Sequence, residues 1–471
     1  MKKSVLLILF SCLITVSFSQ TWTKVECGAQ YSAALKSDST IWSWGFNGNG
    51  QLGIGNTSQR NYPTQVGTDH HWKDISLGAV NGHAIKSDGT LWGWGFNTQG
   101  EVGDSTIIQR TSPVKIGNSN NWKIVESGQA HFLAIKTNGS LWAWGFNFSG
   151  QLGDSTNTDK NHPVQIGVDT NWLKVSCGGY HSLALKKNGT LWAWGNNFSG
   201  ELGDSTTNDI NYPKQIGTDS NWVDIKAGFE FSLGLKSDST IWSWGYNNSG
   251  QLGNNTTSID SIPKQIGTDH NWVKITAGPG YAFAIKSDNT LYGWGINLYG
   301  CLGAGINSEY HSPQQIGQDD DWLDISAAKG FYSSPSIYGY HSLGLKSQKD
   351  NICITGWNAN GQLGDSTTSN TDQFLCVIGI TDGIQNIEGM GNGEWLVYPN
   401  PATDRVVIES KLHGIFKNNV ISIFNLQGQE VQEEILQPGK TEIDITGLAK
   451  GMYVLKVVYN EKAEIRKFIK E

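Results

Sequence analysis

Three glutamates and three histidines are the side chains of this sequence whose chemistry would suit a hydrolytic site. Glycoside hydrolysis needs two carboxylates roughly 5 to 10 Å apart across a cleft. A nucleophilic mechanism needs a base beside a nucleophile and an acid that orients the base. The candidate carboxylates are Glu101, Glu201 and Glu230, and the candidate bases are His131, His181 and His341.

The spacing of these residues argues against catalysis, because most of them recur every 50 residues with a different chemistry. Glu101 and Glu201 occupy the position that is glutamine in other copies, at Gln51, Gln151 and Gln251. An interchangeable Glu/Gln position favours hydrogen bonding over acid–base work. The histidine position holds instead Tyr31, Asn81, Phe231 and Tyr281, which is typical of packing. The sequence therefore predicts no catalytic residues and no enzyme.

Repeated Gly-Asp-Ser-Thr loops are the only candidates for metal binding. Their aspartates are Asp104, Asp154, Asp204 and Asp365. Asp and Ser in such loops hydrogen-bond nearby backbone N–H groups. Calcium binding stays an alternative, although the alternating Asp pattern of calcium loops is missing. There is no CxxC motif and no His/Cys cluster with metal spacing, so we expect neither a metal nor a cofactor.

The elements that position these residues form a 50-residue repeat. Its copies begin at Trp22, Trp72, Trp122, Trp172, Trp222, Trp272 and Trp322. Self-similarity at this period indicates a repeat architecture. Each copy reads as four short strands bounded by Gly, Asn, Asp and Pro, with a hairpin signal such as Asn188-Gly189 and no helical period. Seven such units predict an all-β, seven-bladed β-propeller with four-stranded blades.

The residues of the repeat resemble a known family. The fourth copy carries Gly-x-x-His-Ser (178–182), Leu-Trp-x-Trp-Gly (191–195) and Gly-x-Leu-Gly (200–203). This pattern is similar to the repeat of the RCC1 (regulator of chromosome condensation) family. The resemblance implies a seven-bladed propeller, which we place at residues 20–380. It also implies guanine-nucleotide exchange, as in the eukaryotic namesake, or protein binding, since secreted relatives include a β-lactamase inhibitor protein.

The character of the chain changes after the seventh copy. Residues 381–394 are rich in Gly and Asn and are interpreted as a linker, and residues 395–471 contain short strand-like runs typical of a small Ig-like β-sandwich. The order of motifs in 395–471 resembles the type A C-terminal sorting domain of type IX secretion. The sorting residues that this resemblance implies are Pro399, Asn400, Pro401, Gly451, Tyr453, Lys467 and Lys470.

Both ends of the chain predict export. Residues 1–19 have two lysines, a short apolar run and small residues, which is typical of a secretory signal peptide; a lipoprotein site at Cys12 is the alternative. No later segment is apolar enough to span a bilayer. The sorting domain implies a Gram-negative cell, with the type IX machinery and its sortase as partners. The mature propeller would be released or attached to surface lipopolysaccharide.

Composition limits the other partners. The chain has 34 Lys+Arg against 42 Asp+Glu, a net charge of −8, so nucleic-acid binding lacks its main electrostatic contribution. Cys353 and Cys376 share the last repeat and can form a disulfide in an oxidising location. Cys27 and Cys177 lie three blades apart, too far to be bridged. We expect a monomer.

Divergence between the copies points to one face of the propeller. Antiparallel strands place the loops after strands 1 and 3 of each copy on one face, here called the loop face, and the remaining turns on the opposite face. The turn sequences of the opposite face barely vary between the copies, whereas the loop sequences of the loop face do. The loop face also carries an insertion in the seventh copy, at Lys329–Tyr338. The candidate binding residues are Phe148, Phe198, Tyr180, Phe229, Glu230, Leu298, Tyr299, Phe331 and Tyr332.

Three functions compete for this face. The preferred hypothesis is a secreted or surface-displayed binding module that recognises an extracellular protein or glycan. Guanine-nucleotide exchange is the first alternative, but the export signals would keep the chain away from any intracellular GTPase. A surface carbohydrate-active enzyme is the second, and it depends on the glutamates discussed above.

Overall fold

The structure is a computed structural model. It describes residues 21–305, 308–333, 336–347, 351–378, 395–398, 402–410, 420–425, 430–435, 437, 439–459 and 462–470. The expected signal peptide and linker lie outside these residues.

The first four blades are antiparallel sheets of four consecutive strands. Blade 1 has β1 (Trp22–Cys27), β2 (Tyr31–Lys36), β3 (Ile41–Gly45) and β4 (Arg60–Gln65). Blade 2 has β5 (Trp72–Leu77), β6 (Asn81–Lys86), β7 (Leu91–Gly95) and β8 (Arg110–Lys115). Blade 3 has β9 (Trp122–Ser127), β10 (His131–Lys136), β11 (Leu141–Gly145) and β12 (Lys160–Gln165). Blade 4 has β13 (Trp172–Cys177), β14 (His181–Lys186), β15 (Leu191–Gly195) and β16 (Ile210–Ile216).

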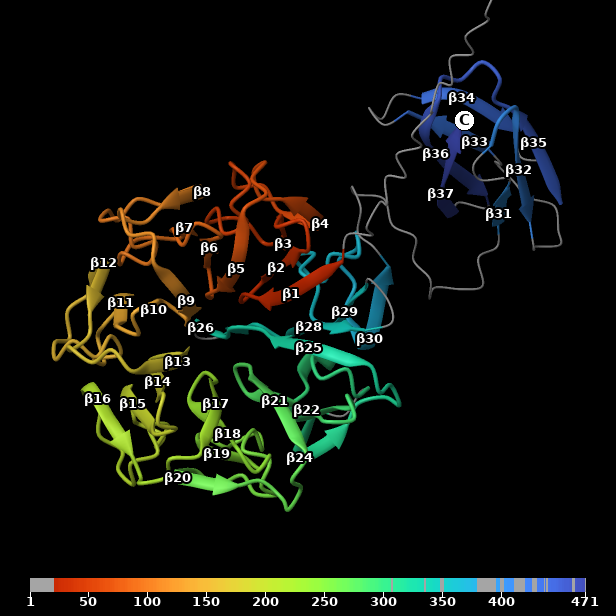
Figure 1. Ribbon diagram of the computed structural model, residues 1–471. Helices are drawn as coiled ribbons and strands as arrows, with labels where there is room; N and C mark the ends of the chain where they lie inside the picture. Colours follow the sequence, from red (N-terminus) through yellow and green to blue (C-terminus); the bar gives the residue numbers. More distant parts are fainter. Residues whose placement is uncertain are drawn as a thin grey trace, which may run out of the picture.

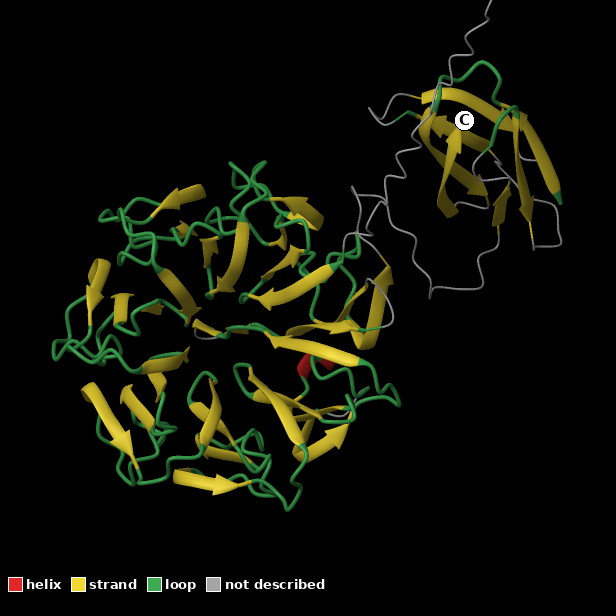
Figure 2. Ribbon diagram, in the orientation of Figure 1, coloured by secondary structure: helices red, strands yellow, loops and turns green. Residues whose placement is uncertain are grey.

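The last three blades repeat this order, with one insertion. Blade 5 has β17 (Trp222–Ala227), β18 (Phe231–Lys236), β19 (Ile241–Gly245) and β20 (Asp260–Gln265). Blade 6 has β21 (Trp272–Ala277), β22 (Tyr281–Lys286), β23 (Leu291–Ile296), the 3₁₀ turn η1 (Leu298–Gly300) and β24 (Glu309–Gln315). Blade 7 has β25 (Trp322–Ala327), the hairpin β26 (Phe331–Ser333) and β27 (Ser336–Tyr338), β28 (His341–Lys346), β29 (Asn351–Gly356) and β30 (Thr371–Ile378). The predicted seven-bladed all-β propeller is therefore confirmed (Figures 1 and 2).

Local sequence explains each blade, as blade 4 illustrates. The tight turn between β14 and β15 contains Gly189 at a φ of 76°, and its N–H donates to the carbonyl oxygen of Lys186 at 2.9 Å. A glycine suits this left-handed conformation because it has no Cβ. The outermost strand, β16, carries Pro213. Proline is tolerated at the edge of a sheet and blocks further strand pairing there.

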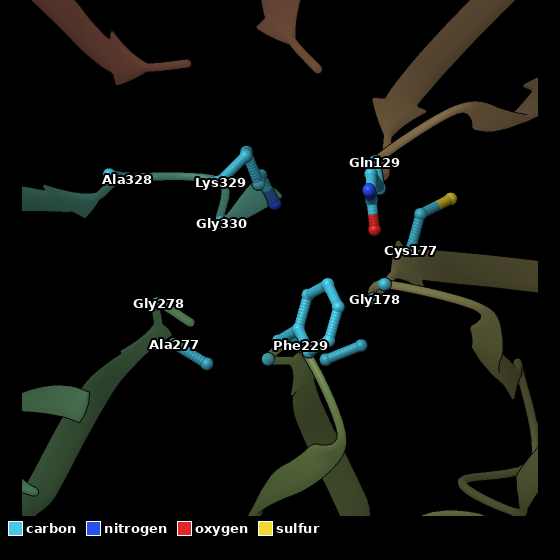
Figure 3. A pocket seen from close by; sticks show the side chains of 12 residues that line it. Gln129, Cys177, Gly178, Phe229, Ala277, Gly278, Ala328, Lys329 and Gly330 are labelled. Atoms are coloured by element: carbon cyan, nitrogen blue, oxygen red, sulfur yellow. The ribbon is translucent and has the colours of Figure 1, made fainter. Parts of the chain in front are cut away.

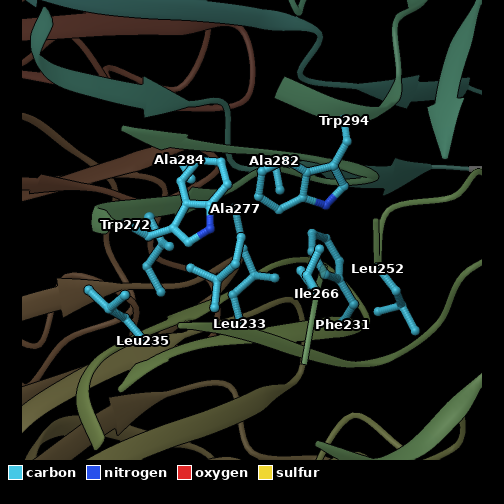
Figure 4. Packing of buried hydrophobic residues seen from close by; sticks show 12 residues of the cluster. Phe231, Leu233, Leu235, Leu252, Ile266, Trp272, Ala277, Ala282, Ala284 and Trp294 are labelled. Carbon is cyan, nitrogen blue, oxygen red and sulfur yellow. The ribbon is translucent and has the colours of Figure 1, made fainter. Parts of the chain in front are cut away.

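Apolar side chains between neighbouring blades form the core. Figure 4 shows Trp272 and Trp294 of blade 6 packed against Phe231 and Leu233 of blade 5. The second tryptophan of each Trp-x-Trp pair also bonds across the interface: the Nε1–H of Trp194 donates to the carbonyl oxygen of Gln151 in the preceding blade at 2.9 Å. Buried indole N–H groups need such partners. The tryptophans therefore serve as core residues rather than as exposed platforms.

A lysine at the end of the second strand of each blade is enclosed by aromatic rings. In blade 4 the Nζ of Lys186 lies 4.7 Å from the ring centroid of Trp172 and 3.6 Å from that of Trp192. The same Nζ lies 2.6 Å from the Oδ2 of Asp169. Cation–π contacts of this kind stabilise partly desolvated lysines. These contacts explain how a charged lysine is accommodated at the end of a strand whose other residues are buried.

The ring closes by packing of the first blade against the seventh. Strand β1 contacts both β25 and β28, and the Nε1–H of Trp44 donates to the carbonyl oxygen of Gln362 at 2.9 Å. This is the bond that Trp194 makes to Gln151 inside the ring. Each blade consists of its own copy of the repeat, so the two ends of the array do not share a blade.

Blade 7 differs from the others in its outer strands. Cys353 of β29 and Cys376 of β30 lie opposite each other in register and form a disulfide. Phe374 stands where the other outer strands have proline, and its ring centroid lies 4.8 Å from that of Trp322. The disulfide and the partly buried ring of Phe374 stand in blade 7 where blades 1 to 5 have a Trp-x-Trp pair and a proline.

The C-terminal part is a second β domain. One sheet contains β31 (Trp395–Tyr398), β32 (Arg405–Ser410) and β35 (Lys440–Asp444), and the other contains β33 (Val420–Phe424), β34 (Glu430–Ile435), β36 (Gly451–Tyr459) and β37 (Lys462–Lys470). Buried Val, Ile and Leu side chains from both sheets form its core. Such packing of two sheets is the sandwich expected from the sequence. Among the described residues, no helix has the length and apolarity to cross a membrane.

Candidate binding face

The candidate catalytic histidines join neighbouring blades in the structure. The Nε2 of His181 lies 2.9 Å from the Oγ of Ser232, and that hydroxyl donates to the carbonyl oxygen of Glu201 at 2.8 Å. The serine oxygen therefore accepts the Nε2–H of a neutral imidazole. Burial lowers the pKa of His181 to about 3. His131 and His341 make the same bond to Ser182 and Ser32, so the packing interpretation agrees with their geometry.

The candidate carboxylates Glu101 and Glu201 are part of tight turns. The Oε2 of Glu201 accepts the backbone N–H of Ser199 at 2.8 Å, and Glu101 accepts that of Gln99 at 2.7 Å. Gln151 makes the equivalent bond in its own copy. Burial raises the pKa of Glu201 to about 7, because the charged form is poorly solvated there. A neutral glutamic acid and a glutamine can thus accept the same backbone hydrogen bond at this position.

The aspartates of the Gly-Asp-Ser-Thr loops are committed to neighbouring side chains. The Oδ1 of Asp204 accepts from the N–H and the Oγ1 of Thr206 at 3.0 and 2.7 Å. Its Oδ2 lies 2.8 Å from the Nζ of Lys214, and the hydrogen bonds of Thr206 and Lys214 hold the pKa of Asp204 below its usual range despite its partial burial. Within the described part of the chain, no three His, Cys, Asp or Glu residues are grouped as metal ligands.

Several predicted binding residues form one aromatic series on blades 3 to 5. Phe148 is 75% exposed and stacks on Phe146, with ring centroids 6.4 Å apart. Tyr180 meets Phe146 edge-on at 6.0 Å and Phe229 edge-on at 5.8 Å. The series therefore leads from an exposed rim toward the axis of the propeller. Among the described residues of this face, Phe198 is the most exposed aromatic residue, at 82%.

Phe229 ends this series at the mouth of the central channel. Figure 3 shows Phe229, Gln129 and Lys329 extending into one narrow space from three different blades. The free volume there is about 10 Å³, enough for a single water molecule. Glu230 lies beside Phe229 and is half-buried, and burial raises the pKa of its carboxyl group. Side chains from several blades therefore meet near the axis on the loop face (Figure 3).

A second aromatic group lies on blades 6 and 7. The ring of Tyr299 stacks on that of Trp357 at 6.1 Å and lies 6.2 Å from that of Tyr340. Tyr299 has a φ of 59°, a left-handed conformation that bulky residues seldom adopt. Leu298 precedes it and is 41% exposed. Phe331 and Tyr332 begin the inserted hairpin, but their side chains lie outside the described structure.

The structure adds a groove that sequence reasoning missed. It spans blades 7, 1 and 2, has a volume of about 510 Å³ and is lined by the rings of Phe46, Phe96 and Trp357. These residues share one position, directly after the glycine that ends the third strand. The signal was present in the sequence as a variable, largely aromatic position: Phe46, Phe96, Phe146, Asn196, Tyr246, Ile296 and Trp357.

The opposite face also carries apolar side chains that were not predicted. The second residue of the first strand is exposed and apolar in four consecutive blades, at Leu173, Val223, Val273 and Leu323. Their exposed fractions range from 37% at Leu173 to 55% at Leu323. Exposed apolar residues in a row are candidates for contact with a partner. The opposite face is therefore a second candidate binding surface.

The predicted sorting residues meet on two adjacent strands where they are described. Gly451 and Tyr453 of β36 pair with Lys470 and Phe468 of β37. The hydroxyl of Tyr453 donates to the carbonyl oxygen of Ala449 at 2.9 Å, and its ring stacks on Phe468 at 5.6 Å. Lys467 also belongs to β37, although its side chain is not described. Pro399, Asn400 and Pro401 lie outside the described residues.

Comparison with protein families agrees with both resemblances. The regulator of chromosome condensation (RCC1) repeat matches residues 38–81, 88–135, 138–185, 188–235, 238–285 and 288–331. A second description of the same repeat matches residues 22–51, 122–151, 172–201, 222–251 and 272–301. The secretion system C-terminal sorting domain matches residues 396–471. This domain marks the chain for secretion or for display on the outer-membrane surface.

Solved structures with the same fold are distant in sequence. Human WBSCR16 is 20% identical with a TM-score of 0.62, covering 70% of this chain and 88% of that protein. Prp20p from Saccharomyces cerevisiae is 17% identical with a TM-score of 0.63, covering 80% and 90%. No curated protein matches the chain significantly. The repeats occupy more than half of the sequence, and the chain therefore belongs to the RCC1 repeat family.

Proposed function

We propose that this chain is an exported binding module that recognises an extracellular protein or glycan through its loop face. The main support is the concentration of accessible aromatic side chains there: Phe148 and Phe198 are 75% and 82% exposed, and Tyr299 is 53% exposed. Large exposed apolar groups are costly to leave in water and typically mark interaction sites. The sorting domain supplies the route to an extracellular partner. We further propose that residues 20–380 act alone after residues 395–471 are removed.

Binding is preferred over carbohydrate hydrolysis because the candidate carboxylates have structural partners. Glu201 accepts a backbone N–H within its own turn, as Gln151 does in another copy. A general acid must instead reach the leaving-group oxygen of a substrate. The raised pKa of Glu201 is explained by burial, without any need for a catalytic role.

Nucleotide exchange is less favoured on grounds of location and sequence. A solved structure of Prp20p is described together with its binding to Gsp1p and histones. At 17% identity that likeness concerns the fold. An acidic chain with a sorting domain would encounter neither a nuclear GTPase nor chromatin.

The test is capture of a partner by the immobilised full chain from medium or host extracts. A triple variant, Phe148→Ala, Phe198→Ala and Tyr299→Ala, removes the three exposed rings of the loop face. We expect it to lose the captured partner, because aromatic anchors dominate interface energies. The control is a double variant of the opposite face, Val273→Ala and Leu323→Ala, which should retain capture.

Two results would overturn this assignment. Equal capture by the wild type and the triple variant would remove the loop face as the site. Loss of capture in the double variant alone would move the site to the apolar row on the opposite face. The unfolding midpoint of each variant shows whether the ring is intact.

A further inference from the structure

The groove across blades 7, 1 and 2 combines a defined volume with a defined chemistry on the loop face. Its volume of about 510 Å³ lies within the usual range of small-ligand sites. Phe46, Phe96 and Trp357 line it from three neighbouring blades and are each half-buried. The rings are therefore held by the protein on one side and accessible on the other.

One residue position that lines the groove is small in blades 1 and 2 and varies in size among the other blades. The first residue after Gly in the loop following strand 1 is Ala29 in blade 1 and Ala79 in blade 2, and both line the groove. In blades 5 and 7 the same position holds Phe229 and Lys329, which extend into the space near the axis (Figure 3), and in blade 4 it holds Gly179. The methyl group of an alanine fills less of this space than the ring of Phe229 or the side chain of Lys329 would. The small volumes of Ala29 and Ala79 therefore favour a hollow between blades 1 and 2.

Four amide residues line the groove. Gln51 is buried, whereas the other three are half-buried and face the groove: Gln30, Asn49 and Asn360. Two of them are presented by fixed turns, since the backbone N–H groups of Asn49 and Asn360 donate to Gln51 and Gln362 at 2.9 Å. Within the described structure, none of the three amide groups has a hydrogen bond to the protein. Each amide offers both a donor and an acceptor, which matches the hydroxyl group, itself a donor and an acceptor.

Charge restricts the ligand further. Among the described residues that line the groove, none has an ionisable side chain, although the chain as a whole carries a net charge of −8. A charged ligand would lose its hydration without gaining a partner. Arginine, which is enriched in protein–protein hot spots, is also missing from this lining. Aromatic faces with neutral amides suit a ring with apolar C–H faces and a rim of hydroxyls.

We propose that this groove binds a neutral oligosaccharide, with pyranose rings stacked on Phe46, Phe96 and Trp357 and hydroxyls bonded to the amides of Gln30, Asn49 and Asn360. The proposal rests on the binding function proposed above and names its ligand class. The ring stacking provides affinity, and the amides select for hydroxyl geometry. A protein partner on the same face is the alternative that the experiment separates.

The test is isothermal titration of the full chain with cellohexaose, xylohexaose, mannohexaose and laminarihexaose, with hexagalacturonate as the charged comparison. We expect at least one neutral hexasaccharide to bind and hexagalacturonate not to bind. Trp357→Ala and Asn49→Ala should each lower that affinity by about tenfold or more. Tyr212→Ala, which removes an exposed aromatic ring of the outer strand β16, should leave it unchanged.

Asn49→Ala guards against misfolding, because its side chain has no partner inside the described protein and its loss should not shift the unfolding midpoint. Failure of all four neutral hexasaccharides to bind would overturn the proposal, as would binding that survives both groove variants. Capture of a protein that the triple loop-face variant loses, without any saccharide binding, would leave the binding function standing and refute only its glycan form.

Discussion

Cys27 in the first strand donates its backbone N–H to the Oγ of Ser326 in the seventh blade at 3.1 Å, across 299 residues of sequence. Inside the ring, Ser127 makes the same bond to Ser76 at 3.0 Å, and Ala227 makes it to Ser176 at 3.0 Å. The junction between the ends of the array therefore uses a contact that neighbouring blades also use. The interface between blades 1 and 7 is therefore equivalent to the other interfaces, although its residues are far apart in the sequence.

This equivalence predicts equal costs for two substitutions. Ser326→Ala and Ser76→Ala each remove a buried hydroxyl acceptor and leave one backbone N–H without a partner. Each should lower the free energy of unfolding by about 1 to 2 kcal/mol, measured by denaturant titration. A much larger loss for Ser326→Ala than for Ser76→Ala would show that the closing interface carries a special share of the stability.

The buried histidines predict a loss of stability in mild acid. The folded pKa of His181 is about 3 and its ordinary value is 6.5, so between these values the unfolded chain binds a proton that the folded chain does not. The free energy of unfolding should then fall as pH decreases from about 6.5 toward 3, by at most about 1.4 kcal/mol per pH unit for each such histidine.

His181→Phe, which copies Phe231 of blade 5, should make this slope shallower. The measurement is the free energy of unfolding between pH 4 and 7 for both proteins. His162→Gln alters an exposed histidine and should leave the slope as in the wild type. An unchanged slope in His181→Phe would contradict the assignment of a neutral, buried imidazole.

The disulfide of blade 7 predicts a redox-dependent stability. Cys353 and Cys376 enclose a sequence separation of 23 residues, and a loop of this length is worth about 3 kcal/mol. Reductant should lower the unfolding midpoint of the wild type. The double variant Cys353→Ser and Cys376→Ser should have the lower midpoint from the start and should not respond to reductant. If reductant leaves the unfolding midpoint of the wild type unchanged, the disulfide does not contribute to stability as proposed.

The sorting domain predicts where the protein accumulates. Deletion of residues 395–471 should leave the propeller inside the cell envelope, because the segment that matches the sorting domain is lost. Fusion of the same residues to an exported carrier should bring the carrier to the surface or the medium. Immunoblots of cell fractions and surface proteolysis provide the measurement, and unchanged surface display of the truncated chain would refute this role.

The repeated residues were enough to predict both the four-stranded blade and the number of blades. Trp, Gly and Leu recur every 50 residues because each blade must bury the same faces against its neighbours, and turns such as Asn188-Gly189 depend only on adjacent residues. Comparison of the copies also predicted structural roles for the glutamate and histidine positions, because other copies have Gln, Tyr or Phe there. A comparison of this kind is informative where the same interaction occurs in every blade.

Contacts between residues that do not repeat could not be predicted in this way, because they depend on how the whole ring closes. Trp357 and Phe46 lie more than 300 residues apart in the sequence, yet both line the groove because blade 7 closes on blade 1. Ala29 of blade 1 and Ala79 of blade 2 also line the groove, beside the rings of Phe46 and Phe96. Shape at the axis of a ring is a property of all seven copies together, and no single copy contains it.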